Sequence, residues 1–186
     1  VMRGETDVTA NYTFGESVKG TLEVTKRSVT LTSATDSKTY DGTPLTNSTV
    51  TVSGDGFVTG EGATYSVTGT ITDPGTVDNE FTYTLNEGTK ADNYNISTVA
   101  GTLTVSKITK EIVITADSDE KMYDGQPLTK ATYTYTEGVL AEGDVLTAVV
   151  EGTITNVGTA DNVVTSYKVM RGETDVTANY TFGESV

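Results

Sequence analysis

The stretch FTYTL at residues 81–85 decides the fold class, because large apolar side chains alternate with threonine at every step along it. Side chains of a β-strand point to opposite faces in turn. A period of two therefore predicts one face toward a core and a threonine face toward water. Residues 29–32, 102–105 and 112–115 alternate in the same way, and no stretch has convincing helical periodicity. The sequence predicts an all-β protein of antiparallel strands.

Glycine-rich turn signals interrupt these stretches at short intervals, which is typical of a β-sandwich or barrel. The turn signals are Asp41-Gly42, Gly54-Asp55-Gly56, Gly60-Glu61-Gly62, Asp73-Pro74-Gly75 and Asn86-Glu87-Gly88. We expect β-sandwich units of immunoglobulin-like architecture. Their expected core comprises Val29, Leu31, Tyr40, Leu45, Val52, Val67, Ile71, Phe81, Tyr83, Tyr94, Leu103 and Val105, with counterparts later in the chain.

The composition argues against catalysis. Threonine is the most prominent residue, with 39 copies beside 19 glycines, and it favours strands over helices. The chain has no cysteine, histidine or tryptophan, so it can form no disulfide and no thiolate metal site, and it lacks the commonest general base. No nucleophile elbow, phosphate loop or metal triad accompanies the acidic residues. We predict that the protein is not an enzyme and has no catalytic, cofactor-binding or metal-binding residues.

The charge balance excludes two classes of partner. With 26 acidic and 12 basic residues the formal net charge is −14, which is unsuited to nucleic acid or to anionic membrane surfaces. No apolar run approaches the ~20 residues of a spanning helix, so we expect no membrane insertion within this segment. No signal peptide is visible at Val1, as expected of a piece from the interior of a long protein.

The chain contains two levels of repetition. Residues 1–18 recur without change at 169–186, so the long period is 168 residues. Inside that period a second repeat occurs at a constant offset of 83 residues, which we call the unit offset. At this offset Tyr40 matches Tyr123, Ile71 matches Ile154 and Asn79 matches Asn162. We therefore predict three segments: 1–26, the tail of a preceding B-type repeat; 27–107, unit A; and 108–186, unit B. We expect matched positions such as Tyr40 and Tyr123, or Ile71 and Ile154, to have matching environments.

Residues 39–46, TYDGTPLT, and 122–129, MYDGQPLT, are each followed by an Asn-Tyr pair, and a Gly-Thr-Leu-x-Val sequence occurs at 101–105 and again at 20–24. This ordered set resembles the Tyr-Asp-Gly (YDG) and mostly-β glycine-rich (MBG) repeats of large bacterial cell-surface proteins. The resemblance implies an extracellular, adhesin-like or cell-wall protein whose β units lie end to end in an elongated rod. The expected function is a structural stalk or fibre. Alternatives are an adhesive module for a host protein or glycan, and an ice-binding surface.

Four sequence features are candidate functional sites, and each has a plainer structural interpretation. The Tyr-Asp-Gly segments are interpreted as tight turns, with ligand contact as the alternative. Acidic residues that could bind calcium are interpreted as solvated loops. Recurring lysines and asparagines allow an intramolecular isopeptide cross-link, and threonine triplets allow ice binding. The acidic residues are Asp36, Asp41, Asp117, Asp119, Glu120 and Asp124; the cross-link candidates are Lys38, Lys121, Asn79 and Asn162.

Residues 20–24, GTLEV, match the closing strand GTLTV of unit A at 101–105. Unit B as given has no such strand of its own, so its sheet would have an open edge, which readily pairs with another chain. We expect head-to-tail donation, in which residues 20–24 of one molecule complete unit B of the next. Fraying of the repeated ends is the alternative. The expected partners are neighbouring repeat units or copies of the chain, besides any unknown surface ligand.

Overall fold

A computed structural model describes residues 1–184, and it confirms the all-β prediction. Strands predominate, and three-residue 3-10 helices are the only helical structure in these residues. The strands are β1 (Met2–Arg3), β2 (Thr6–Asp7), β3 (Arg27–Ser33), β4 (Asp36–Thr39), β5 (Val50–Gly54), β6 (Ala63–Val67), β7 (Gly75–Asn79), β8 (Phe81–Leu85), β9 (Tyr94–Val99), β10 (Gly101–Ser106), β11 (Ile114–Ala116), β12 (Tyr133–Tyr135), β13 (Asp144–Glu151), β14 (Val163–Arg171) and β15 (Thr174–Asp175). The 3-10 helices are η1 (Thr9–Asn11), η2 (Ala91–Asn93) and η3 (Thr177–Asn179).

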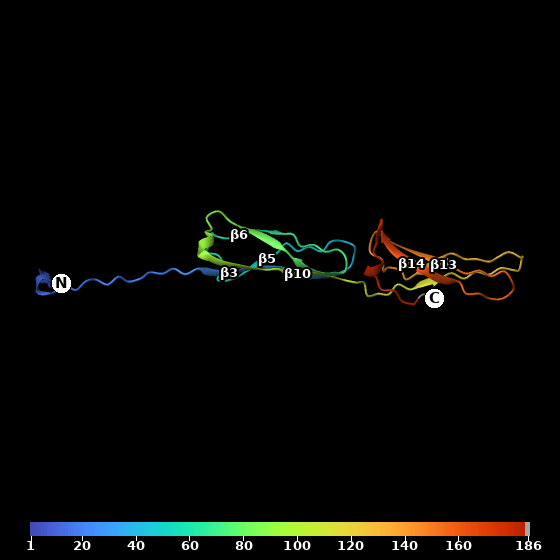
Figure 1. Ribbon diagram of the computed structural model, residues 1–186, viewed down its shortest axis with the longest axis horizontal. Helices are drawn as coiled ribbons and strands as arrows, with labels where there is room; N and C mark the ends of the chain where they lie inside the picture. Colours follow the sequence, from blue (N-terminus) through green and yellow to red (C-terminus); the bar gives the residue numbers. More distant parts are fainter. Residues whose placement is uncertain (185–186) are drawn as a thin grey trace.

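Strands β3 to β10 form three small sheets within residues 27–106. Their orders are β5-β3-β9, β4-β10-β7 and β6-β8. Figure 1 shows these strands running along the long axis of the view. Residues 81–85 form strand β8, as predicted, and Tyr83 lies opposite Tyr65 of β6 in the antiparallel register. The predicted alternation of burial is only partial, because Phe81 and Leu85 are half-buried whereas Tyr83 is exposed.

Two strand pairs are parallel, which corrects the expectation of antiparallel strands throughout. β3 pairs with β9 in parallel, with Val29 opposite Ile96, and β4 pairs with β10 in parallel, with Asp36 opposite Leu103. A long connection lies between the members of each pair, as parallel strands require. Alternation along a strand reports burial of one face and carries no information about the direction of the neighbouring strand.

The later part of the chain repeats several of these pairings. Leu128 forms an isolated bridge with Ile154, as Leu45 does with Ile71. Ile112 bridges Phe182 in parallel, which corresponds to the β3–β9 pairing. The prediction that Ile71 and Ile154 have matching environments is confirmed, because both are half-buried and both form this bridge.

Seven of the predicted core residues of the first unit are buried, but two are exposed. Val52 is 43% exposed and Tyr83 is 37% exposed. Val52 lies on the edge strand β5, opposite the buried Leu31 of the central strand β3, and Tyr83 lies in a two-stranded sheet. The buried residues are Val29, Leu31, Tyr40, Leu45, Tyr94, Leu103 and Val105; Val67, Ile71 and Phe81 are half-buried.

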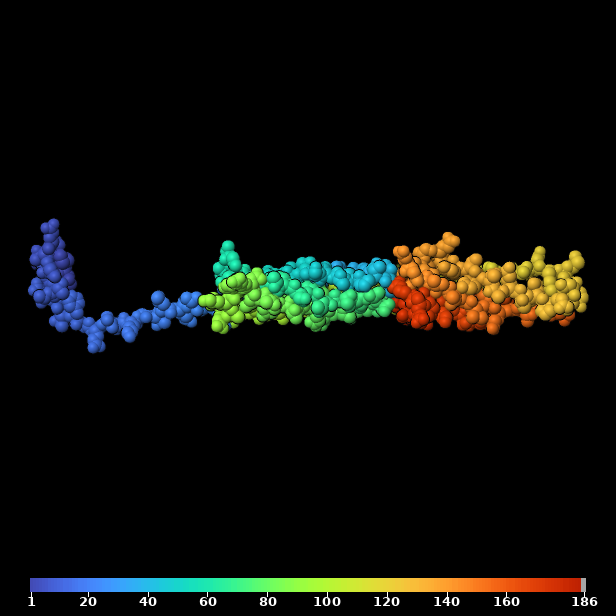
Figure 2. All heavy atoms as spheres, turned by 90° about the horizontal axis from the view of Figure 1, so that it is seen from above, coloured from blue at the N-terminus to red at the C-terminus, as the bar shows by residue number. Residues whose placement is uncertain are grey.

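The N-terminal segment packs against little else. β1 and β2 form a small hairpin, and the structure assigns no strand between η1 and β3, where the chain runs as a thin extended segment (Figures 1 and 2). Tyr12 is 51% exposed there, whereas the identical residue of the second copy, Tyr180, is 4% exposed. Since the local sequence is the same, the burial of Tyr180 comes from the strands around it.

Candidate functional site

The most elaborate set of contacts joins the two repeat units. Tyr40, directly after β4, packs edge-on against the ring of Tyr180, with 5.8 Å between ring centroids. The guanidinium of Arg171, at the end of β14, lies 5.3 Å from the centroid of the Tyr40 ring. A cation over an aromatic face and an edge-to-face ring pair are both favourable geometries. Tyr40 is 2% exposed because side chains of the second unit cover it.

A buried carboxylate links these three side chains. Asp144, at the start of β13, accepts a hydrogen bond from Arg171 Nε at 2.7 Å on Oδ1. Its Oδ2 accepts from the hydroxyl of Tyr180 at 2.5 Å and from that of Tyr40 at 3.3 Å. Burial raises the pKa of both tyrosines, so both hydroxyls stay protonated and remain donors. The carboxylate of Asp144 therefore has three donors inside the junction, namely one guanidinium N–H and two tyrosine hydroxyls.

Further contacts fix the relative position of the units. Arg171 Nη1 donates to the carbonyl of Gly42 at 2.6 Å, and Asn179 Nδ2 donates to Asp73 Oδ1 at 2.8 Å. Gly42 has φ of +80°, and a Cβ there would lie 1.7 Å from an Arg171 nitrogen. The glycine of the Tyr-Asp-Gly turn is therefore needed both for its backbone conformation and for the close approach of Arg171.

The apolar core continues across the junction. One cluster of buried residues combines Leu103 and Val105 of the first unit with Ile112, Val169 and other residues of the second. A separate, smaller cluster around Val29, Leu31 and Tyr94 lies in the first unit. The two units therefore share apolar packing instead of touching only through polar groups.

Tyr40 and Tyr123 do not have matching environments, so that prediction is wrong. Tyr123 is 62% exposed and Met122 is 91% exposed. Within residues 1–184 nothing covers the second Tyr-Asp-Gly turn, and a Cβ at Gly125 would meet no atom within 4 Å. The local sequences correspond, but only Tyr40 has a following unit packed against it.

The opposite end of unit A has a tyrosine–carboxylate pair like the one that unit B contributes to the junction. The Tyr94 hydroxyl donates to Glu61 and accepts from the backbone N–H of Val58 at 3.1 Å. In unit B the Tyr180 hydroxyl donates to Asp144 and accepts from the backbone N–H of Ala141 at 2.9 Å. Glu61 and Val58 precede their counterparts by the same unit offset that separates Tyr40 from Tyr123. Both units therefore present a tyrosine–carboxylate pair at the same end.

Five of the six acidic residues considered for calcium accept hydrogen bonds from nearby residues, and Glu120 is the exception among the described residues. Asp41 binds Lys38 Nζ at 2.7 Å and the backbone N–H of Thr43 at 2.8 Å, and these contacts lower its pKa. Asp124 forms the equivalent pair with Lys121 at 2.8 Å. The described residues, 1–184, contain no group of three or more potential metal-ligating side chains. The Asp-Gly turns are held by a lysine in both units.

We expect the chain to melt at the same temperature in a chelator and in millimolar calcium, because its loop carboxylates already accept hydrogen bonds from the protein. A ligand that binds only the folded state raises the melting temperature, so differential scanning fluorimetry with each additive measures this directly. A calcium-dependent rise of several degrees would contradict the expectation.

The lysine and asparagine candidates for a cross-link do not meet. The Nζ atoms of Lys38 and Lys121 contact the aspartate of their own Tyr-Asp-Gly segment. The amide Nδ2 of Asn79, and that of Asn162, instead donates to two backbone carbonyls at 2.8–2.9 Å. These asparagines tie neighbouring loops together in both units, which explains why they recur at the unit offset.

Sequence reasoning missed Asp144, Arg171 and Asn179 as junction residues. The only signal that could have found Asp144 is its match with Glu61, an acidic residue at the same place in the other unit.

Comparison with known proteins adds no family: no protein-family model matches the chain, no curated protein matches its sequence, and no solved structure matches its fold. Among residues 1–184, no helix is long and apolar enough to cross a membrane.

Proposed function

We propose that this chain is a structural repeat segment of an extracellular bacterial surface protein, in which β-sandwich-like units stand end to end as a stalk or fibre. The observation that carries the proposal is the junction between the two units. It combines the hydrogen bonds of Asp144 with Tyr40 and Arg171 and an apolar core that both units share. A junction of this kind holds neighbouring units in one relative orientation, as a stalk requires.

Repetition supports the same role. Repeat proteins gain stability from contacts between neighbours, and each unit here buries only a small core of its own. The net charge of −14 and the threonine-rich outer faces favour hydration and oppose sideways clumping. The proposed partners are therefore other repeat units, met end to end, and the proposed location is the outer face of the cell.

Solution X-ray scattering of the full chain tests the extended arrangement. The pair-distance distribution is expected to be that of a long, narrow particle, and the Tyr40→Ala variant is expected to broaden it because the junction then bends. A compact particle for the unaltered chain would contradict the proposal. Surface labelling of intact source cells with an antibody to this chain tests the location, and labelling only after cell lysis would contradict it.

A further inference from the structure

The closing strand of unit A lies between two neighbours. β10 runs parallel to β4 on one side and antiparallel to β7 on the other. It inserts Leu103 and Val105 into the core, where they are 0% and 2% exposed. Its first residue, Gly101, passes so close to the backbone that a Cβ would lie 2.4 Å from two carbonyl oxygens. Only glycine fits at that point.

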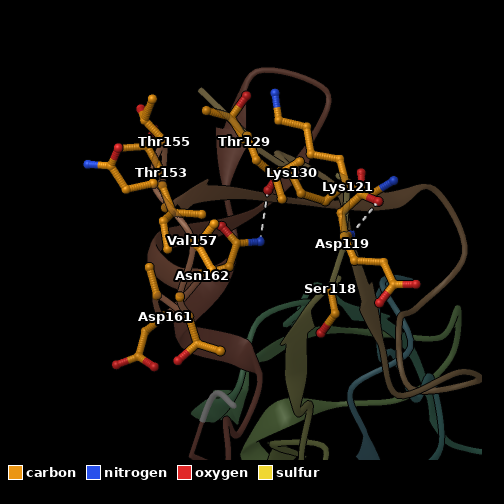
Figure 3. A pocket seen from close by; sticks show the side chains of 18 of the residues that line it. Ser118, Asp119, Lys121, Thr129, Lys130, Thr153, Thr155, Val157, Asp161 and Asn162 are labelled. Atoms are coloured by element: carbon orange, nitrogen blue, oxygen red, sulfur yellow. Dashed lines mark hydrogen bonds between the residues drawn. The ribbon is translucent and has the colours of Figure 1, made fainter. Parts of the chain in front are cut away.

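Unit B has a groove where this strand would lie. Residues 119–122 correspond to β4 and residues 158–162 to β7, but neither segment forms a strand here. Between them is a cavity of about 650 Å³, lined on one side by Ser118, Asp119 and Lys121 and on the other by Asp161 (Figure 3). No segment of the described residues fills it. The two flanking segments lie where a central strand would pair with both.

The chain also contains a strand sequence that has no partner. Residues 20–24, GTLEV, repeat the glycine, leucine and valine positions of β10. Leu22 and Val24 are 101% and 98% exposed, although their counterparts Leu103 and Val105 are core residues. This segment lies toward the N-terminal end of the chain, away from the groove (Figure 1). Exposing two large apolar side chains on an extended segment is unfavourable, and burying them in a groove would remove their apolar surface from water.

We propose that the groove of unit B binds the segment equivalent to residues 20–25 of the next repeat period as a donated strand, and that a second copy supplies this segment when the chain is taken by itself. The register follows from β10: Leu22 lies opposite Asp119 in the parallel pair and opposite Ala160 in the antiparallel pair. In unit A, Thr35 Oγ1 accepts a hydrogen bond from the backbone N–H of Thr102. Ser118 corresponds to Thr35 and Thr21 corresponds to Thr102, so the Ser118 hydroxyl accepts the backbone N–H of Thr21 in the donated strand. Strand addition of this kind combines backbone hydrogen bonds with pockets for alternate side chains.

The proposed contact between two copies is head-to-tail, with the N-terminal segment of one copy bound to unit B of the other. The donor segment leads into β3, so the second copy presents Tyr94 and Glu61 toward the exposed Tyr123 of the first. The stretch from Val24 to Val29 is two residues shorter than the matching stretch from Val105 to Ile112, so the spacing at this junction differs from that at the Tyr40 junction. A head-to-tail contact of this kind does not close on itself and builds filaments. The inference deepens the proposed function and rests on it, since end-to-end units need a contact from one period to the next.

Sedimentation equilibrium of the full chain tests the donation. Oligomers are expected to grow with concentration and to disappear in the Leu22→Asp, Val24→Asp double variant, whose changed side chains are solvent-exposed in their own chain. The groove of that variant is intact, so it is expected to bind a fluorescent peptide of residues 19–26, and a peptide carrying the Leu22→Asp change is expected to bind about tenfold more weakly or worse. A scrambled peptide is the composition control.

Cross-linking tests the register, because the chain has no cysteine of its own. A Leu22→Cys chain mixed with an Ala160→Cys chain is expected to form a disulfide-linked pair, whereas a Thr9→Cys chain with the same partner is not. The proposal is overturned if the unaltered chain stays monomeric, if the double variant associates equally well, or if both cysteine pairs react alike. A monomeric but elongated chain would overturn strand donation and leave the proposed stalk role standing.

Discussion

Replacing Tyr40 with alanine is expected to lower the free energy of unfolding by about 3–5 kcal/mol, the usual cost of deleting a buried aromatic ring. Tyr40 is 2% exposed, packs on Tyr180 and lies under the guanidinium of Arg171. Its loss leaves a cavity between the units and removes one donor from Asp144. Urea denaturation followed by circular dichroism measures the change. Separation of one unfolding transition into two would show that the units have become independent.

Tyr123→Ala is the matched control, because it removes the same side chain from the corresponding turn of unit B. Tyr123 is 62% exposed, and surface substitutions usually change stability by no more than about 0.5 kcal/mol. The control is measured at low protein concentration, where copies of the chain do not associate. Equal losses for the two variants would contradict the interpretation that Tyr40 acts through the junction.

Replacing Asp144 with alanine is expected to lower the free energy of unfolding by roughly 3 kcal/mol, because it leaves a partly buried guanidinium and two tyrosine hydroxyls without their acceptor. The side chain of Asp144 is fully buried, and that of Arg171 is about a quarter exposed. Asp144→Asn keeps one acceptor oxygen for the tyrosines while it removes the charge, so its cost is expected to be smaller. Chemical denaturation of both variants measures the difference.

Glu61→Ala is the matched control for Asp144→Ala, since Glu61 accepts from Tyr94 in the same way at the other end of unit A. Among the ion pairs of the described residues, Glu61 has no arginine partner. It also accepts a hydrogen bond from one tyrosine there, whereas Asp144 accepts from two. Its removal is expected to cost less than that of Asp144. A larger effect at Glu61 would mean that the tyrosine–carboxylate pair, and not the contact between units, supplies the stability.

The repeat pattern predicted much of the fold because the same local contacts, made by matching residues, recur along the chain. Asn79 and Asn162 tie loops in the same way, and the bridge between Leu45 and Ile71 reappears in unit B at the unit offset. Alternation likewise placed Val29 and Leu31 in the core. These features depend on short-range sequence and on side-chain type, which a single sequence reports directly.

The junction could not be predicted in the same way, because its burial is decided by what lies beyond each unit. Tyr40 and Tyr123 sit in corresponding sequences, yet only Tyr40 is covered. Asp144 and Arg171 are 27 residues apart and meet only because β13 pairs with β14. The direction of β9 relative to β3 also depends on long connections, on which the alternation of side chains carries no information.

The placement of β3 and β10 has a consequence for resistance to pulling. Each is the central strand of a three-stranded sheet, and the strands run along the long axis in Figure 1. Hydrogen bonds between strands lie across the strand direction. Tension applied at Arg27 and Ser106 would therefore load the bonds on both sides of each terminal strand in shear. Extraction of either strand requires many of these bonds to rupture together, so the unit resists tension far better than it would if its end strands could be peeled away one bond at a time.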